Sequence, residues 1–156
     1  MIILYSHKVW FTPYPTKPVA LSLVDPFTSF PKVDDFRPLY HFAPDQNCMN
    51  EPNDLIQIGS EWHFFSQHNP TGNFWGNLSW GHATSAGLVN WTHLRVTISS
   101  ANGIQALTGT SDFDEENKPG LGTSEGLPYL AFYIEYFPNT EAQDQRLGYN
   151  LKQGEA

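Results

Sequence analysis

Glycine and proline are spread along this chain and divide it into short segments. The sequence has 12 Gly and 12 Pro among its 156 residues. Both residues interrupt helices, and no apolar pattern of helical period continues over the length of a helix. The hydrophobic content of 40% and the aromatic content of 15% are sufficient for one globular core of ordinary size. We therefore predict an all-β chain.

Short apolar and aromatic runs between turn residues mark the expected strands. Residues 55–58 and 62–65 are separated by Gly59 and Ser60, which predicts a β-hairpin. Four further strands, each bounded by Gly, Pro or Asn, are expected at residues 78–84, 105–113, 129–137 and 146–151. The stretch 115–128 is expected to form a surface loop. This spacing is compatible with the blades of a sheet repeat, although no strict internal repeat is visible.

The first part of the chain differs from the rest. Residues 1–36 carry five prolines without a sustained pattern, which predicts an extended and poorly ordered lead-in before a folded part at residues 37–156. The apolar run at residues 1–5 is too short for a signal peptide or a membrane span. The single cysteine, Cys48, cannot form a disulfide within the chain. The sequence therefore leaves the cellular compartment open.

Charge and motif content exclude several classes of function. A formal net charge of −8 and a pI of about 5.0 would repel nucleic-acid phosphates and anionic lipids, so neither partner is expected. The spacing of the six histidines matches no zinc signature, and one cysteine cannot complete a thiolate site. Gly-x-Ser-x-Gly, Walker and Cys-x-x-Cys motifs are absent from the sequence. We expect a neutral ligand, with no metal and no cofactor.

Three motifs follow one another in the segment 40–94. The first consists of Tyr-His-Phe at residues 40–42 followed by Met-Asn-Glu-Pro-Asn at 49–53. The second is His-Phe-Phe-Ser-Gln-His-Asn-Pro at 63–70, and the third is Trp-Gly-Asn-Leu-Ser-Trp-Gly-His-Ala at 75–83. In this order they resemble the signatures of glycoside hydrolase family 32, the family of invertases and inulinases. Leu-Thr-Gly-Thr at residues 107–110 is similar to a further family segment. The resemblance covers residues 37–156.

The resemblance implies both a fold and a reaction. The fold is a five-bladed β-propeller, and a chain of this length would hold roughly its first two blades. The reaction is the hydrolysis of β-fructosides such as sucrose, inulin or levan by a retaining double displacement, which requires two carboxyl groups. Fructose-containing saccharides are the implied partners. Members of the family are often secreted, but no signal peptide is visible in this sequence.

The resemblance also assigns roles to individual residues. Glu51 occupies the position of the nucleophile, where the family usually has Asp. One extra methylene moves a carboxylate by on the order of 1 Å, and a misplacement of that size can reduce a rate by about 10²-fold. Asn50, Gln67, Trp75 and Thr110 are the implied substrate-binding residues. Amides offer donors and acceptors to vicinal hydroxyls, while an indole offers a flat apolar face to a sugar ring.

Other residues of the motifs have a structural interpretation. Trp80 and Trp91 are expected to pack in the core rather than to bind sugar. Cys48 stands where the family usually has Trp, and Asp54 stands where it usually has Gly. We expect the substitution at Asp54 to be tolerated because Asp accepts left-handed backbone better than most residues.

Two further motifs of the family are missing from this sequence. The general acid/base lies in a Glu-Cys dipeptide and the transition-state stabiliser in an Arg-Asp-Pro tripeptide, and the sequence has neither. The chain alone is therefore expected to be feeble or inactive, and two alternatives to an enzyme stay open: a non-catalytic sugar-binding or interaction module, and a truncated product without function. Two blades of a propeller would leave bare flanks, for which we expect residues 64–65 and 130–137 to supply an apolar, self-associating surface.

Overall fold

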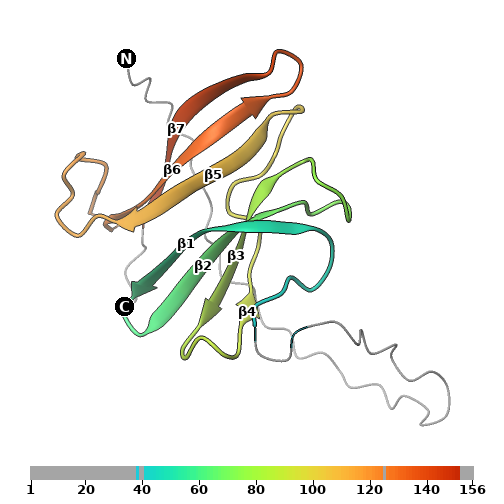
Figure 1. Cartoon of the computed structure of the whole chain (residues 1–156). Helices are drawn as coiled ribbons and strands as arrows, with labels where there is room; N and C mark the ends of the chain where they lie inside the picture. Colours follow the sequence, from blue (N-terminus) through green and yellow to red (C-terminus); the bar gives the residue numbers. More distant parts are fainter. Residues whose placement is uncertain (1–37, 39–40, 125, 152–156) are drawn as a thin grey trace, which may run out of the picture.

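A computed structural model describes residues 38, 41–124 and 126–151 of the chain. Within these residues the regular structure consists of seven β-strands in two antiparallel sheets, with no helix (Figure 1). The all-β prediction is confirmed. The predicted lead-in at residues 1–36 lies outside the described residues.

The first sheet has the order β1-β2-β3-β4. Its strands are β1 (Met49–Ile58), β2 (Glu61–His68), β3 (Ser79–Ser85) and β4 (Thr92–His93). Ile58 pairs with Glu61 across the turn that contains Gly59, whose φ of 63° requires the left-handed backbone that glycine adopts easily. The predicted hairpin is therefore confirmed.

The second sheet has the order β5-β6-β7 and contains β5 (Gln105–Phe113), β6 (Pro128–Phe137) and β7 (Ala142–Leu151). The bounds of β5 agree with the prediction, whereas β7 begins four residues earlier than the predicted 146. The pairing of Phe137 with Ala142 extends β7 through a polar, exposed stretch that gives no apolar signal. Among the described residues no strand pairs with the outer edge of β7.

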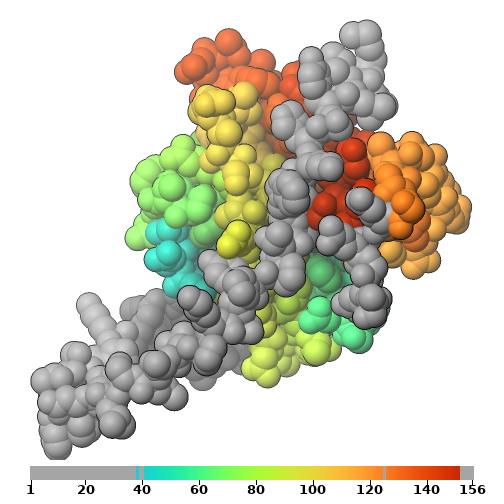
Figure 2. Space-filling view, turned by 180° about the vertical axis from the view of Figure 1, so that it is seen from behind, coloured from blue at the N-terminus to red at the C-terminus, as the bar shows by residue number. Residues whose placement is uncertain are grey.

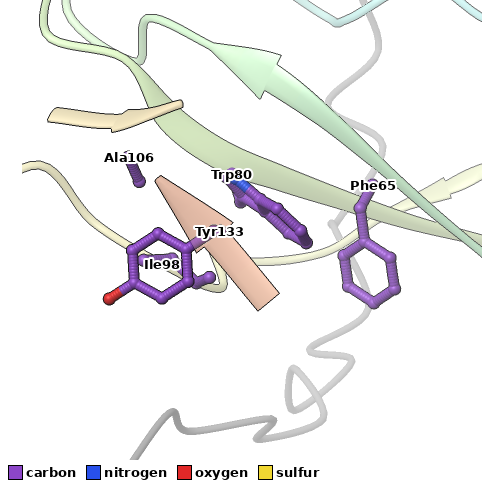
Figure 3. Packing of buried hydrophobic residues seen from close by; sticks show 5 residues of the cluster. All are labelled: Phe65, Trp80, Ile98, Ala106 and Tyr133. Carbon is purple, nitrogen blue, oxygen red and sulfur yellow. The ribbon is translucent and has the colours of Figure 1, made fainter. Parts of the chain in front are cut away.

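The core lies between the two sheets (Figure 3). Phe65 and Trp80 of the first sheet meet Ala106 and Tyr133 of the second, and Ile98 completes the cluster. Trp80 is fully buried, and its ring centroid lies 5.9 Å from that of Phe65 and 6.2 Å from that of Tyr133. Its indole Nε1 donates a hydrogen bond to the Leu107 carbonyl oxygen at 2.8 Å. The predicted core position of Trp80 is confirmed.

The opposite face of the first sheet carries a smaller aromatic group. Trp91 is half-buried there and packs against Phe42 and Phe64, with ring centroids 5.4 and 5.6 Å away. Phe42 also contacts Phe64 directly, at 4.6 Å between centroids. Trp91 therefore has a packing role, as predicted.

The surface predicted for self-association is smaller than the sequence indicated. Phe65, Leu130 and Tyr133 are buried, and only Phe132 of that set is strongly exposed, at 46%. The expectation that these runs would be bare throughout was wrong, because alternate residues of a strand point to opposite faces and Phe65 and Tyr133 fill the space between the sheets. Self-association itself stays a prediction.

Gly109 lies where the backbone of β6 and the indole of Trp80 both approach β5 closely. A Cβ atom placed there would lie 2.1 Å from the Phe132 carbonyl oxygen and 2.7 Å from Cζ2 of Trp80. The backbone of Gly109 is not left-handed, so space rather than conformation requires glycine at this position.

We predict that Gly109→Ala destabilises the fold by about 1–3 kcal/mol or more, because neither a backbone carbonyl nor a buried indole can move away without disturbing the packing. Gly87→Ala is the matched control, since a Cβ at Gly87 has no neighbour within 4 Å and its φ is not positive. Urea unfolding followed by tryptophan fluorescence measures both. Equal stability of the two variants would contradict the close approach.

A pair of histidines lies on the inner face of the first sheet. Nδ1 of His63 and Nε2 of His82 are 3.1 Å apart, and the two rings stack with centroids 5.2 Å apart. His82 also stacks on Phe65 at 4.5 Å. Burial, and secondarily the proximity of His63, lowers the pKa of His82 to about 3. The folded chain therefore keeps His82 neutral.

We predict an acid-sensitive contribution of His82 to stability. The unfolded chain takes up a proton on His82 below its ordinary pKa of 6.5, whereas the folded chain does not. The contribution is fully present above pH 6.5 and is lost at about 1.4 kcal/mol per pH unit as the pH falls toward 3. Unfolding free energies at pH 7, 6 and 5 should fall less steeply for His82→Gln than for the original chain. The exposed His41 offers the control variant His41→Gln, which should retain the steep slope, and identical slopes in all three proteins would refute the assignment.

Candidate functional site

Four polar side chains meet where three strands come together. Asn50 and Glu51 lie at the start of β1, Gln67 lies near the end of β2, and Thr108 lies in β5. β1 and β5 are the first strands of their sheets and pack beside each other (Figure 1). The site thus spans both sheets.

The Glu51 carboxylate is the centre of this cluster. Its Oε1 accepts hydrogen bonds from Nε2 of Gln67, at 3.0 Å, and from the Thr108 hydroxyl, while its Oε2 accepts one from Nδ2 of Asn50 at 3.1 Å. Gln67 also bonds the other two directly, donating to Oγ1 of Thr108 at 2.7 Å and accepting from Nδ2 of Asn50 at 3.2 Å. Each of the four side chains is therefore oriented by the others.

Burial differs sharply within the cluster. Gln67 is only 3% exposed, whereas Asn50, Glu51 and Thr108 are exposed. A buried amide thus holds an accessible carboxylate in one orientation. The exposed oxygens and nitrogens offer donors and acceptors close together, which suits a neutral ligand rich in hydroxyl groups.

The pairing of β1 and β5 with their neighbouring strands is irregular near the residues of the cluster. The register of β1 against β2 shifts between Met49 and Pro52 and again between Pro52 and Asp54, and that of β5 against β6 shifts between Ala106 and Gly109. Such bulges redirect side chains and are frequent beside active sites. Pro52, which has no N–H to donate, is tolerated because β1 is an edge strand.

Asp54 links β1 to the edge of β5. Its Oδ2 accepts hydrogen bonds from the Ser111 backbone N–H at 2.5 Å, from the Ser111 hydroxyl at 2.8 Å and from the Thr110 hydroxyl at 3.1 Å. Burial alone would raise the pKa of Asp54 and is the largest single influence, but the hydrogen bonds from Ser111, Leu55 and Thr110 together outweigh it and hold that pKa below its ordinary value.

The role of Asp54 differs from the one expected. Its backbone is part of a strand and is not among the left-handed positions of the described residues. Asp54 acts through its carboxylate, which holds β5 against β1 and so keeps Thr108 beside Glu51.

The structure separates the predicted substrate-binding residues. It brings Asn50 and Gln67 together with Glu51, but Thr110 bonds to Asp54 instead of joining the cluster. Thr108, two residues earlier in the same Leu-Thr-Gly-Thr segment, takes the position beside Glu51. The resemblance pointed to Thr110 and not to Thr108, and the two residues are both exposed and two positions apart on β5. Alternation along the strand therefore does not distinguish them, and only the packing of β5 against β1 brings Thr108 to Glu51.

Trp75 lies in the loop at residues 69–78, between β2 and β3, and is 58% exposed. The loop is held against the residues that lead into β1. The Cys48 N–H donates to the Gly72 carbonyl oxygen at 3.0 Å, and the Asn69 N–H donates to the Cys48 carbonyl oxygen at 2.9 Å. Trp75 is therefore an accessible aromatic side chain in a loop held beside the start of β1, where Asn50 and Glu51 lie.

The described part of the chain has neither a metal-ligating cluster nor a helix that could cross a membrane. Its His, Cys, Asp and Glu side chains form no group of three or more that could hold a metal ion. It also contains no helix with the length and apolar character needed to cross a membrane.

Comparison with known sequences identifies a family match and several curated relatives. Residues 41–156 match the sequence model described as the glycosyl hydrolases family 32 N-terminal domain. A putative glycosyl hydrolase ecdE of Aspergillus rugulosus is 36% identical over 155 residues, covering 88% of this chain and 22% of the relative. Levanase of Bacillus subtilis is 38% identical over 102 residues, which cover 65% of this chain and 15% of the levanase. The extracellular exo-inulinase inuE of Aspergillus niger is 34% identical over 135 residues, which cover 76% of this chain and 25% of the exo-inulinase.

Solved structures show the same similarity. Exo-inulinase from Aspergillus awamori superimposes with a TM-score of 0.67 at 33% identity, covering 73% of this chain and 25% of that one. The fructofuranosidase from Schwanniomyces occidentalis, solved with fructose, gives a TM-score of 0.65 at 32% identity, covering 76% and 26%. The chain thus spans about a quarter or less of the proteins that it matches.

Proposed function

The chain belongs to glycoside hydrolase family 32, and we propose that its polar cluster binds the fructosyl unit of a β-fructoside and supplies the nucleophile for hydrolysis of that unit. The N-terminal domain of the family is a five-bladed β-propeller, of which the two sheets represent two neighbouring blades. The observation that carries the proposal is the Glu51 carboxylate, which is exposed yet held by hydrogen bonds from Asn50, Gln67 and Thr108.

The names of the relatives support a fructose-containing substrate. Levanase, exo-inulinase and invertase are among them, and one structural neighbour was solved with fructose. A fructosyl unit is neutral and carries several hydroxyl groups, which match the amide donors and acceptors of Asn50 and Gln67. The accessible indole of Trp75 offers an apolar face to the same sugar ring.

The proposed reaction is a double displacement. The Glu51 carboxylate attacks the anomeric carbon of the fructosyl unit, the glycosidic oxygen leaves with a proton, and water then releases fructose from the covalent intermediate. The proton requires a second carboxyl group. The Glu-Cys and Arg-Asp-Pro motifs of the family do not occur in this sequence. Among the described residues, the side-chain hydrogen bonds of Glu51 come from Asn50, Gln67 and Thr108, none of which is a carboxyl group.

We therefore infer that residues 1–156 by themselves bind sugar but turn it over feebly or not at all. Loss of general acid catalysis alone reduces a rate by about 10²- to 10⁴-fold. A second candidate function is sugar binding without turnover. It is favoured by the absence of the Glu-Cys and Arg-Asp-Pro motifs from this sequence and by the presence of Glu51 where the family usually has Asp.

We predict that Glu51 is required for turnover in a complete family domain, which a chimeric enzyme would provide. Residues 41–156 would replace the corresponding part of the Aspergillus awamori exo-inulinase, which supplies the rest of the family domain. Glu51→Gln in this chimera should reduce fructose release from inulin by more than about 10³-fold, because an amide cannot attack the anomeric carbon. Glu51→Asp, which keeps the carboxylate, is the matched control and should retain turnover. A folded chimera that binds fructose but releases none would favour the sugar-binding candidate.

We also predict that the two threonines of β5 differ in their effect on sugar binding. Thr108→Val removes a hydroxyl that contacts both Glu51 and Gln67, and should weaken fructose binding by about 3- to 10-fold, the effect of one hydrogen bond. Thr110→Val removes a hydroxyl that contacts Asp54 and should leave the affinity nearly unchanged. Isothermal titration of fructose into the two variants measures the difference. A loss confined to Thr110→Val would restore the original assignment of that residue and remove Thr108 from the site.

A further inference from the structure

Phe74 is an exposed aromatic residue directly before Trp75. We propose that its ring forms a second sugar-binding surface, which contacts the saccharide unit attached to the fructosyl unit. The inference rests on the proposed function, because it takes the fructosyl unit to lie at the Glu51 cluster. It goes further by assigning a residue that selects saccharides of two or more units.

Exposure alone would not carry this proposal. Phe74 is 63% exposed, the highest value among the large apolar side chains that the structure describes as exposed. Single exposed apolar residues are common and need no explanation. The distinguishing feature of Phe74 is that its ring packs in a fixed position against two glycines, Gly72 and Gly76. This position is called the seat of the ring.

Two glycines form that seat. A Cβ atom at Gly72 would lie 2.6 Å from Cε1 and 3.2 Å from Cζ of Phe74, and one at Gly76 would lie 3.7 Å from Cε2 and 3.8 Å from Cδ2. The ring therefore rests with its two edges on the two glycines and leaves the rest of its surface to solvent. Gly72 does not have a left-handed backbone, so its lack of a side chain serves to make room for the ring.

The backbone that carries the ring is fixed by a buried side chain. Asn69 is fully buried; its Nδ2 donates to the Phe74 carbonyl oxygen at 2.9 Å, and its Oδ1 accepts from the N–H and the hydroxyl of Thr71 at 2.9 and 2.8 Å. The loop cannot rotate Phe74 inward without breaking these hydrogen bonds. An exposed ring held in one place is preorganised for a ligand.

The loop is also held next to the Glu51 cluster. Gly72, under the ring, accepts a hydrogen bond from the N–H of Cys48, two residues before Asn50. Asn47 adds a second link through its Nδ2, which donates to the Pro70 carbonyl oxygen at 2.8 Å. In Figure 2 the light-green atoms of this region lie directly against the cyan atoms of the segment that leads into β1. The ring of Phe74 therefore borders the same end of β1 as the carboxylate.

A saccharide fits this arrangement better than a protein partner does. Sugar rings have apolar C–H faces that pack on aromatic rings, while their hydroxyls are satisfied by amides and carboxylates. Consecutive Cα atoms are only about 3.8 Å apart, so adjacent aromatic side chains can contact neighbouring units of one saccharide. With Trp75 at the fructosyl unit, Phe74 meets the next unit.

The test compares ligands with one and two sugar units. Affinities for fructose, sucrose and an inulin-type disaccharide are measured by isothermal titration for the 156-residue chain and for Phe74→Ala, Gly72→Ala and Phe74→Tyr. Phe74→Ala removes the ring, and Gly72→Ala keeps the ring but displaces it from its seat. Both should weaken binding of at least one of the two disaccharides by about 3- to 10-fold and leave fructose binding unchanged. Phe74→Tyr, which keeps the aromatic face, should bind like the original chain.

The outcomes distinguish this inference from the function on which it rests. Fructose binding with unchanged disaccharide affinities in both alanine variants overturns the inference and leaves the proposed function intact. Equal losses for fructose and for the disaccharides also overturn it, because Phe74 would then act at the fructosyl unit. A chain that binds none of the three sugars overturns the proposed function and this inference together. Thermal melting of the variants, expected to be unchanged for an exposed ring, confirms that they are folded.

Discussion

The packing of Trp80 between the two sheets is the contact on which the rest of the structure depends. Its ring fills the space between Phe65 and Tyr133, and its indole N–H bonds to the Leu107 carbonyl oxygen. A single residue thus supplies both apolar contact and a directional bond to β5. Because the bond is made at the residue before Thr108, it also fixes the part of β5 that reaches Glu51. The absence of a side chain at Gly109 allows this approach.

The site uses the same junction between the sheets. Gln67 and Trp80 are directly opposite each other in the β2–β3 pairing, so the residue that braces the carboxylate is adjacent to the residue that joins the sheets. Asp54 adds a polar link between β1 and β5 on the other side of the bulge. The cluster around Glu51 is therefore oriented by contacts between two blades and not by one blade alone. A comparable arrangement occurs in the loop between β2 and β3, where the buried Asn69 donates a hydrogen bond to the backbone carbonyl oxygen of Phe74 and so fixes the backbone that carries the exposed ring.

Much of the fold could be predicted from the sequence, because its signals are local. The Gly59 turn and the apolar runs bounded by Gly, Pro or Asn specify strands and hairpins within a few neighbouring residues. The start of β7 could not be predicted, since its first residues are polar and exposed and pair only because β6 lies beside them. The burial of Phe65 and Tyr133 was also missed, because it depends on which faces of the two sheets meet.

The sequence by itself determined the family, the all-β character and three residues that the structure brings into one polar cluster, Asn50, Glu51 and Gln67, because ordered motifs preserve residue type and spacing. Only the tertiary structure decided which threonine of β5 joins them. Thr108 and Thr110 are two positions apart and both exposed on β5, so they look equivalent in the sequence. The packing of β5 against β1 places Thr108 beside Glu51 and Thr110 beside Asp54. The same holds for Asp54, whose carboxylate finds its partners 56 and 57 residues away. Contacts at that separation are set by the packing of two sheets, which no local pattern specifies.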